Sequence, residues 1–352
     1  MQDLSERDCA LEEGVRPPIS GGVLNLVGNT PLLQLERILP DDRFTLFAKL
    51  ESFNPAGSVK DRPAMNIILS ALARGEIDED TTIIEYSSGN FGIGLAQVCA
   101  MLGLRFICVL DGRATKQNVA IIKAFGGEVD VVLEPDPVSG ELLQACVQRV
   151  NTLCDKVPNS FWPNQHANMD NAKAHRNTMR EIAVSLENKV DYLFCATSTC
   201  GTLRGCAEYV RDNGLSTKVI AVDAMGSLIF SNKQSKRIIP GHGAGRPPKL
   251  LQPDLADACY HVTALESIEG CRLLLRKEAL MMGGSSGGII STILKHADEI
   301  PDGAICAAIL CDRGERYLNT VYSDDWVKSH FPEFEGYPSP NTPLSRTFYE
   351  SE

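Results

Sequence analysis

Short apolar runs with the length of buried strands alternate along this chain with longer segments of helical spacing. Nearly continuous apolar strands are typical of parallel sheets that are covered on both faces. The alternation predicts an α/β fold with mainly parallel sheets. The predicted strands are Thr45–Glu51, Ile83–Ile84, Phe106–Leu110, Val129–Leu133, Tyr192–Ala196, Val219–Asp223 and Ala304–Leu310. The predicted helices are Pro63–Arg74, Ile93–Leu102, Lys116–Phe125, Glu141–Leu153, Leu203–Asp212 and Ser286–Ala297.

The length of 352 residues suits two domains of ordinary size. We expect a smaller, mobile domain at residues 60–161 and a larger domain formed by residues 1–59 and 162–330. The segment 331–352 carries prolines and acids and is expected to be a loosely ordered tail. Residues 234–254 are rich in Pro, Gly and basic side chains, which indicates a functional loop.

Composition excludes several classes of partner. The net charge of −11 argues against nucleic acid and anionic membranes. Residues Met1–Arg16 have acids and no apolar core, so we expect no signal peptide, and no apolar run has membrane-spanning length. The 12 cysteines lie in apolar segments without a C-x-x-C pair. They predict buried thiols in a reducing cytoplasm, without disulfides or a metal site.

Lys60 lies in the most informative turn of the chain, between a predicted strand and a predicted helix. Gly57 and Ser58 suit a tight turn, and Ser58 or Asp61 could cap the helix. A lysine at a helix N-terminus meets the positive end of the helix dipole, which disfavours an ammonium. This position suits a neutral amine that forms an imine with a carbonyl cofactor. The alternative is a solvated turn lysine.

Three further loops lie at helix starts, where backbone N–H groups bind anions. The loop Glu85–Gly92 offers Ser87, Ser88 and Asn90 as side-chain donors. The loop Ala196–Thr202 has four hydroxyl residues and a glycine, which suits a phosphate. In Gly283–Gly288, glycines allow a close backbone approach, and a serine could bond a heterocycle nitrogen. Taken singly, each loop could equally be an ordinary polar turn or a capped helix start.

Together, the lysine and the three loops resemble the cysteine synthase family of fold type II pyridoxal-phosphate enzymes. The resemblance runs from Gly28-Asn-Thr-Pro-Leu32 to Asp312-Arg-Gly-Glu-Arg-Tyr317. It implies a pyridoxal 5'-phosphate cofactor, two α/β domains with twisted sheets, a homodimer, and an internal aldimine at Lys60. It implies that Asn90 contacts the ring hydroxyl of the cofactor and that Ser285 contacts its ring nitrogen. The implied phosphate cradle comprises Ser198, Thr199, Cys200, Gly201 and Thr202, and the implied carboxylate site comprises Ser87, Ser88, Gly89, Asn90 and Phe91.

Three departures from ordinary cysteine synthases point to a different nucleophile. Cys200 replaces a glycine of the phosphate loop, Phe91 replaces a threonine, and Trp162 stands where a carboxylate-binding glutamine is usual. These departures resemble the N-(2-amino-2-carboxyethyl)-L-glutamate synthases of siderophore pathways such as that of staphyloferrin B. The segments Ala221–Phe230, Pro240–Pro248 and Tyr322–Trp326 add to this resemblance. It implies that O-phospho-L-serine and L-glutamate are joined through an aminoacrylate, on the route to 2,3-diaminopropionate.

Two anionic substrates need cationic partners, and arginine matches both anions. Arg246 is the candidate for a substrate anion, with a surface ion pair as the alternative. His166 is a candidate substrate contact, with a structural histidine as the alternative. Competing functions are a cysteine synthase or other β-substituted alanine synthase, a serine or threonine dehydratase, and a catalytically inactive amino-acid-binding regulator.

Overall fold

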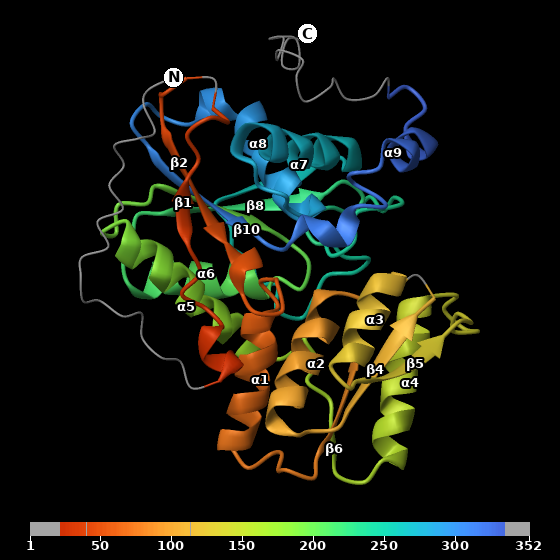
Figure 1. The fold of residues 1–352 in the computed structure, drawn as a ribbon. Helices are drawn as coiled ribbons and strands as arrows, with labels where there is room; N and C mark the ends of the chain where they lie inside the picture. Colours follow the sequence, from red (N-terminus) through yellow and green to blue (C-terminus); the bar gives the residue numbers. More distant parts are fainter. Residues whose placement is uncertain (1–21, 40, 113, 335–352) are drawn as a thin grey trace, which may run out of the picture.

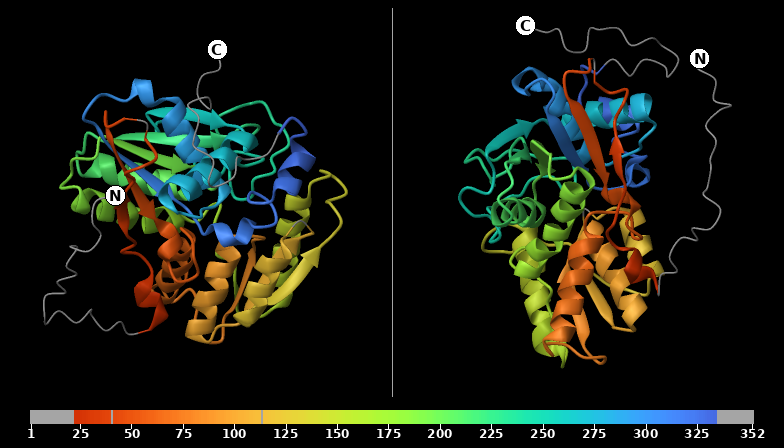
Figure 2. Two further views of the ribbon diagram at one scale, coloured as in Figure 1. Left: turned by 45° about the horizontal axis from the view of Figure 1, so that its top comes forward. Right: turned by 90° about the vertical axis from the view of Figure 1, so that its left-hand side faces the viewer.

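The chain forms two α/β lobes that lie one above the other in Figure 1, each built around its own sheet. The computed structural model describes residues 22–39, 41–112 and 114–334. The views of Figure 2 show helices on both faces of the sheets. The predicted α/β architecture with mainly parallel sheets is confirmed.

The larger sheet has six strands in the order β1-β2-β10-β7-β8-β9. β1 runs antiparallel to β2, and all other neighbours are parallel. The strands are β1 (Leu32–Gln34), β2 (Thr45–Leu50), β7 (Tyr192–Ala196), β8 (Lys218–Ala224), β9 (Ala258–Val262) and β10 (Ile305–Leu310). The register pairs Leu310 at the end of β10 with Leu50 at the end of β2. The segments that follow these two strands therefore start side by side.

Two helix pairs cover the larger sheet. Helices α5 (Met169–Ser185) and α6 (Gly201–Asp212) pack on one face, and α7 (Ala264–Glu278) and α8 (Gly284–Lys295) pack on the other. A capping box between Thr263 and Glu266 starts α7. Short elements complete this lobe: η3 (Glu51–Phe53), η4 (Ala297–Glu299), η5 (Gly314–Tyr317) and α9 (Asp324–His330). The short helix η2 (Val23–Leu26) packs instead against the smaller lobe, where Leu24 contacts the apolar core.

The smaller sheet has four parallel strands in the order β5-β4-β3-β6. They are β3 (Thr82–Tyr86), β4 (Phe106–Asp111), β5 (Glu128–Val132) and β6 (Ser160–Phe161). Helices α1 (Asp61–Ala73), α2 (Asn90–Leu102) and α3 (Lys116–Ala124) share one apolar core with this sheet, and α4 (Leu142–Lys156) packs on its other face. Helix α1 also packs on α5, so it joins the two lobes.

The predicted elements agree with the observed ones to within about three residues, whereas β1, β6, β9, α5, α7 and α9 were not predicted. The four strands of the smaller sheet lie between Thr82 and Phe161, but the domain limits at 60 and 161 and the mobility of that domain stay predictions. The segments Met1–Arg16 and 335–352 lie outside the described residues. In the described part of the chain, no helix has the length and apolar character that crossing a membrane requires. The cysteines of this part are free thiols, and most are buried.

Candidate active site

Lys60 occupies the position just before the first residue of α1. The turn that carries it is held by its own side chains: the Asn54 amide donates to the Ser58 carbonyl at 3.1 Å, and the Ser58 hydroxyl accepts from the Lys60 N–H at 3.1 Å. The Asp61 carboxylate accepts from the Ala56 N–H at 2.6 Å. The prediction that Ser58 or Asp61 caps the helix was wrong, because both side chains bond the turn and α1 has no side-chain cap.

This turn is attached to the segment that leaves β10. The Val59 N–H donates to the Cys311 carbonyl at 2.7 Å, and the Arg313 N–H donates to the Gly57 carbonyl at 3.2 Å. Gly57 has a φ of +86°, which a side chain would strain. Residues some 250 positions apart in sequence therefore form one wall around Lys60.

The Lys60 side chain is half-buried, and its environment favours the neutral amine. Burial lowers the pKa of the amine below its usual value, while the nearby Cys311 and Asp312 raise it by a smaller amount. The predicted preference for a neutral amine is thus supported by burial, and the effect of the helix dipole stays a prediction.

The first predicted loop connects β3 to α2. The Ser87 hydroxyl accepts from the Gly92 N–H at 2.9 Å, so it serves the first turn of α2. An added Cβ on Gly89 would meet no atom within 4 Å, so the loop borders open space. Phe91 is 2% exposed and packs in the core of the smaller lobe. Its side chain therefore does not line the loop, and only its backbone remains available to a carboxylate.

The Asn90 side chain is held by residues that we did not single out from the sequence. Its amide donates to the Asp312 carboxylate at 2.7 Å, and Arg316 donates to its carbonyl oxygen. The Tyr317 hydroxyl also donates to Asp312, at 2.5 Å. Burial raises the pKa of Asp312, and the bonds from Tyr317 and Asn90 oppose this change. The quoted motif Asp312–Tyr317 contained these residues, but its spacing alone did not reveal their target.

The second predicted loop lies between β7 and α6. The Thr199 hydroxyl accepts from the Gly201 N–H at 3.3 Å and from the Asn171 amide at 3.2 Å. Within the described residues, the backbone N–H groups of Ser198, Thr199 and Cys200 have no hydrogen-bond acceptor. A Cβ on Gly201 would lie 2.1 Å from the side-chain amide oxygen of Asn171, so a larger residue there would have to displace Asn171. Free N–H groups at a helix start form a cradle for a phosphate.

Cys200 has a left-handed backbone with a φ of +63°, the conformation that usually selects glycine. Burial raises the pKa of its thiol to about 12, so the thiol is protonated. The Thr202 hydroxyl lies 3.3 Å from Nε2 of the buried His175, which fixes the first turn of α6 to α5.

The third predicted loop places Ser285 in the first turn of α8, close to Cys311. The neighbouring Ser286 hydroxyl accepts from the Cys311 N–H at 2.9 Å. Burial raises the pKa of the Cys311 thiol to about 11, and the charge of Lys60 lowers it by less. The candidate ring-nitrogen partner and Lys60 thus both lie near Cys311.

His166 and Arg246 come from distant segments and lie close enough to interact electrostatically. Burial, and to a smaller extent the charges of Arg246 and Lys60, lower the pKa of His166 to about 4. Arg246 is exposed, and no carboxylate of the described residues forms an ion pair with it. The three candidates Lys60, His166 and Arg246 therefore border one region.

The half-buried Trp162 and the buried Glu85 form a pair beside the first loop. The Trp162 indole donates to the Glu85 carboxylate at 3.1 Å, and the Gln165 N–H donates to the same group at 3.3 Å. Burial raises the pKa of Glu85 to about 7, although these bonds oppose the change. The pair fixes the segment that carries His166 to the end of β3.

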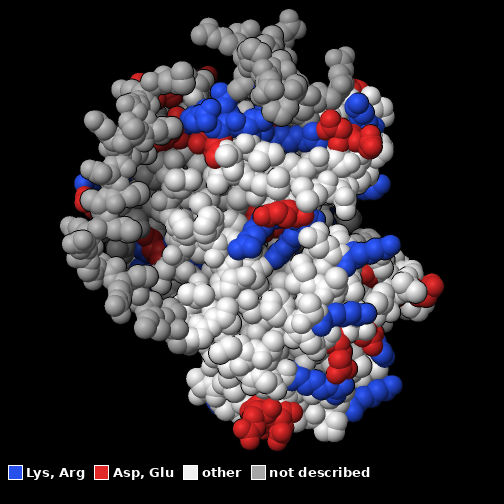
Figure 3. All heavy atoms as spheres, viewed as in Figure 1, with Lys and Arg blue, Asp and Glu red and all other residues white. Residues whose placement is uncertain are grey.

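These features fit a pyridoxal phosphate. The neutral amine of Lys60 suits its aldehyde, and the Asn90 amide suits its ring hydroxyl. The Ser285 hydroxyl suits its ring nitrogen, and the free N–H groups of residues 198–200 suit its phosphate. On the face in Figure 3, basic and acidic side chains lie next to one another along the upper rim, in a small group near the middle and on the lower lobe, and the surface between these groups is largely uncharged.

Comparison with known proteins agrees with this fit. Residues 23–312 match the family model described as pyridoxal-phosphate dependent enzyme. An O-ureido-L-serine synthase is 30% identical, with a TM-score of 0.81 over 89% of this chain and 100% of that chain. A hydrogen sulfide-producing enzyme from Fusobacterium nucleatum is 32% identical, with a TM-score of 0.80 over 86% and 99%. A cysteine synthase from Entamoeba histolytica is 30% identical, with a TM-score of 0.82 over 93% and 94%.

The matched family model covers most of the chain, and the similar structures are enzymes of the cysteine synthase kind. The chain therefore belongs to the pyridoxal-phosphate dependent enzymes, and among them it is a fold type II enzyme of β-replacement.

Proposed function

We propose that this enzyme joins O-phospho-L-serine to L-glutamate and gives N-(2-amino-2-carboxyethyl)-L-glutamate. The Cβ–O bond of phosphoserine breaks and releases phosphate, a Cβ–N bond forms to glutamate, and the glutamate ammonium gives up a proton. Both substrates carry an anionic group beyond the α-carboxylate, so the site needs a cation that is free to bind it.

The main support for this proposal is the position of Arg246. It is exposed, it lies near His166, which is itself near Lys60, and no carboxylate of the described residues neutralises it. A guanidinium fork binds a carboxylate or a phosphate through two parallel hydrogen bonds. A cysteine synthase that uses sulfide would not need such a group for its nucleophile.

The residues around Lys60 would divide the work. When bound, the cofactor withdraws electrons from the substrate α-carbon. The neutral Lys60 amine is suited to take the α-proton and return it, as a general base and then a general acid. The loop at Ser88 and Gly89 would hold the α-carboxylate, and the free N–H groups of 198–200 would hold the cofactor phosphate. Ser285 offers a hydroxyl and no carboxylate to the ring nitrogen, which suits elimination at the β-carbon.

A product assay by mass spectrometry tests the substrates. The enzyme is incubated with O-phosphoserine or O-acetylserine, each with glutamate or sulfide. We expect the glutamate adduct from O-phosphoserine. Arg246→Gln should raise the KM of one anionic substrate about tenfold, the effect of losing a charged hydrogen bond, whereas Lys249→Gln, an exposed cation of the same loop, should leave it unchanged. Efficient formation of cysteine alone would refute the proposal.

A cysteine synthase is the second candidate, because the enzyme from Entamoeba histolytica covers 93% of this chain at 30% identity. The same assay separates the two functions. An inactive regulator is tested by the visible absorbance of the bound cofactor in the parent enzyme and in Lys60→Ala. Absence of the band from the parent enzyme would support the regulator. Release of pyruvate without a second substrate would indicate a dehydratase. A homodimer in the cytoplasm remains part of the proposal.

A further inference from the structure

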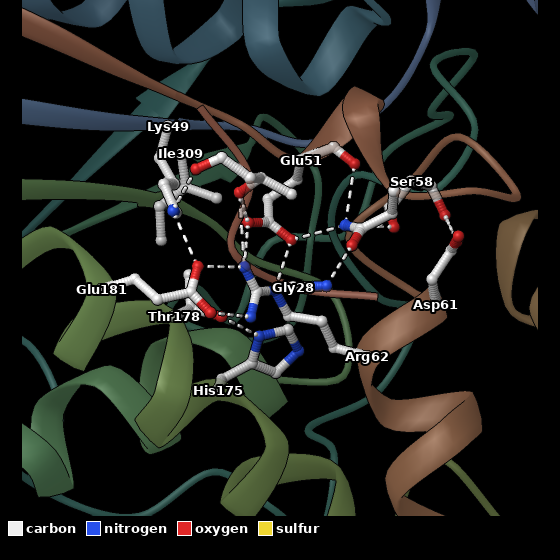
Figure 4. A network of polar contacts seen from close by, with 12 residues as sticks. Gly28, Lys49, Glu51, Ser58, Asp61, Arg62, His175, Thr178, Glu181 and Ile309 are labelled. Carbon is white, nitrogen blue, oxygen red and sulfur yellow. Dashed lines mark hydrogen bonds and ion pairs between the residues drawn. The ribbon is translucent and has the colours of Figure 1, made fainter. Parts of the chain in front are cut away.

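A buried network of charges surrounds Arg62, the second residue after Lys60 (Figure 4). The Arg62 side chain binds Glu51 through two hydrogen bonds, of 2.6 and 2.8 Å. It also binds Glu181 through two, of 2.8 and 2.7 Å. Lys49 lies 2.7 Å from Glu181 and completes a set of two cations and two anions. Glu51 is fully buried and Arg62 is 4% exposed, so solvent does not weaken these contacts.

The network attaches the start of α1 to the larger lobe. Lys49 lies on β2, Glu51 follows it directly, and Glu181 lies on α5. Glu51 also accepts from the Asn54 amide at 2.9 Å, and that amide donates to the Ser58 carbonyl. Glu51 therefore holds the Lys60 turn from one side while Arg62 holds it from the other.

Helix α5 connects this network to the phosphate loop. Near its start, Asn171 donates to Thr199 at 3.2 Å, and His175 lies 3.3 Å from Thr202. Near its end, Glu181 binds Arg62. Figure 4 shows His175, Thr178 and Glu181 projecting from α5 toward the network. One rigid helix thus contacts both the loop that suits the cofactor phosphate and the helix that begins after Lys60.

The rest of α1 belongs to the other lobe. Its residues Ile67, Ile68 and Ala71 are fully buried in the core of the smaller sheet. A movement of the smaller lobe would act on this end of α1, whereas the buried charges hold the end next to Lys60. A buried ion pair is a weak source of stability compared with apolar packing, but its fixed geometry specifies position.

We propose that Arg62 is a positioning residue, which fixes Lys60 relative to the phosphate loop through Glu51, Glu181 and α5. This inference rests on the proposed role of Lys60 in the reaction. Arg62 does not contact the substrate in this assignment. Its bidentate bonds set where the lysine amine lies, and a displacement of about 1 Å at a reacting group lowers turnover by about 100-fold.

Arg62→Lys tests the proposal, because it keeps the charge and loses the fork that binds two carboxylates at once. The first measurement uses the full-length protein after removal of the cofactor. The rate of acetylation of Lys60 by acetic anhydride is followed against pH by mass spectrometry. We expect the pKa of the Lys60 amine to move back toward its usual value in the variant, because the displaced side chain loses its burial. In the holoenzyme, kcat should fall by about 100-fold with little change in KM.

Two further variants complete the design. Arg272→Lys is the matched control: Arg272 is buried on α7, donates to the Val321 carbonyl at 2.9 Å and pairs with Asp324, away from Lys60. It should leave the Lys60 titration and kcat unchanged. Glu181→Gln keeps the shape of the network and removes one charge, so it replaces Arg62→Lys if that variant does not fold. It should change the Lys60 titration and kcat in the same direction as Arg62→Lys, by a smaller amount.

Parent-like titration of Lys60 together with parent-like kcat, in a folded Arg62→Lys or Glu181→Gln protein, would overturn the proposal. The acetylation readout needs no catalysis. If Lys60→Ala kept the cofactor absorbance and the turnover, the proposed role of Lys60 would fail, while the Lys60 titration would still decide whether Arg62 sets the position of the amine.

Discussion

Glu85 makes the stability of this protein depend on pH in a calculable way. The carboxylate is 1% exposed, accepts bonds from Trp162 and Gln165, and has no cationic partner among the described residues. Burial raises its pKa from 4.5 to about 7. Cys108 is the titratable neighbour on β4, and its thiol is protonated over this range because burial raises its pKa.

The sign follows from proton linkage. Between pH 4.5 and 7 the folded state keeps a proton on Glu85 that the unfolded state has lost. The contribution of this group to stability is therefore greatest below pH 4.5 and falls as the pH rises to about 7. A pKa change from 4.5 to about 7 corresponds to about 3 kcal/mol.

Glu85→Gln mimics the protonated acid at every pH and should remove this dependence. The substitution also removes a hydrogen-bond acceptor, which lowers stability by the same amount at every pH. This constant loss does not affect how the difference in stability between the two proteins changes with pH. Between pH 4.5 and 8, the free energy of unfolding of the variant should rise by about 3 kcal/mol relative to that of the parent protein. Urea unfolding of the cofactor-free protein, followed by circular dichroism, measures the difference.

Glu128→Gln is the control of opposite sign. The Arg105 guanidinium holds the pKa of Glu128 below its usual value of 4.5, so this variant should lose stability relative to the parent as the pH rises toward 4.5, and the difference should change little between pH 4.5 and 8. Parallel curves for the parent and Glu85→Gln over this range would refute the reasoning, because Glu85 would then titrate alike in the folded and unfolded states.

Three other substitutions test separate parts of the site. Gly201→Ala should weaken cofactor binding by tenfold or more in a spectrophotometric titration, because its Cβ would lie 2.1 Å from Asn171 and about 1.4 kcal/mol suffices for that factor; an unchanged affinity would show that the loop can relax. Gly270→Ala should cost about 3 kcal/mol of unfolding free energy, because its Cβ would lie 2.0 Å from the Gly287 carbonyl between α7 and α8; a parent-like urea midpoint would contradict this. Cys200→Gly should retain turnover, because the thiol is buried and protonated; a loss as large as that of Lys60→Ala would make Cys200 a reacting group.

The strands and most helices could be predicted because their buried faces are apolar. Helix α5 could not, because its buried side chains include Asp170, Asn171, His175 and Thr178. These polar groups contact the phosphate loop, a neighbouring helix and one another. Because they stand on the buried face of the helix, the apolar spacing that predicts a helix is interrupted there.

The candidate site was predicted where each loop carried its own signal of glycines and hydroxyls at a helix start. Asp312 and Arg316 were assigned no role, because their meaning depends on Asn90, more than 200 residues away. The same holds for Glu85, whose burial follows from a partner at Trp162. Charged residues in a sequence do not reveal whether the fold buries them.

The position of β10 governs the order in which the two lobes can be completed during synthesis. All strands of the smaller sheet described by the structure have been made by residue 161, whereas β10, the last strand of the described residues, pairs between β2 and β7. Until Ile305–Leu310 leave the ribosome, β2 and β7 have no partner on that side, and unpaired edges invite association with other chains. The wall formed by Cys311 and Arg313 against the Lys60 turn comes later still. The nascent chain therefore carries its reactive lysine for most of its synthesis before the surroundings that tune that lysine exist.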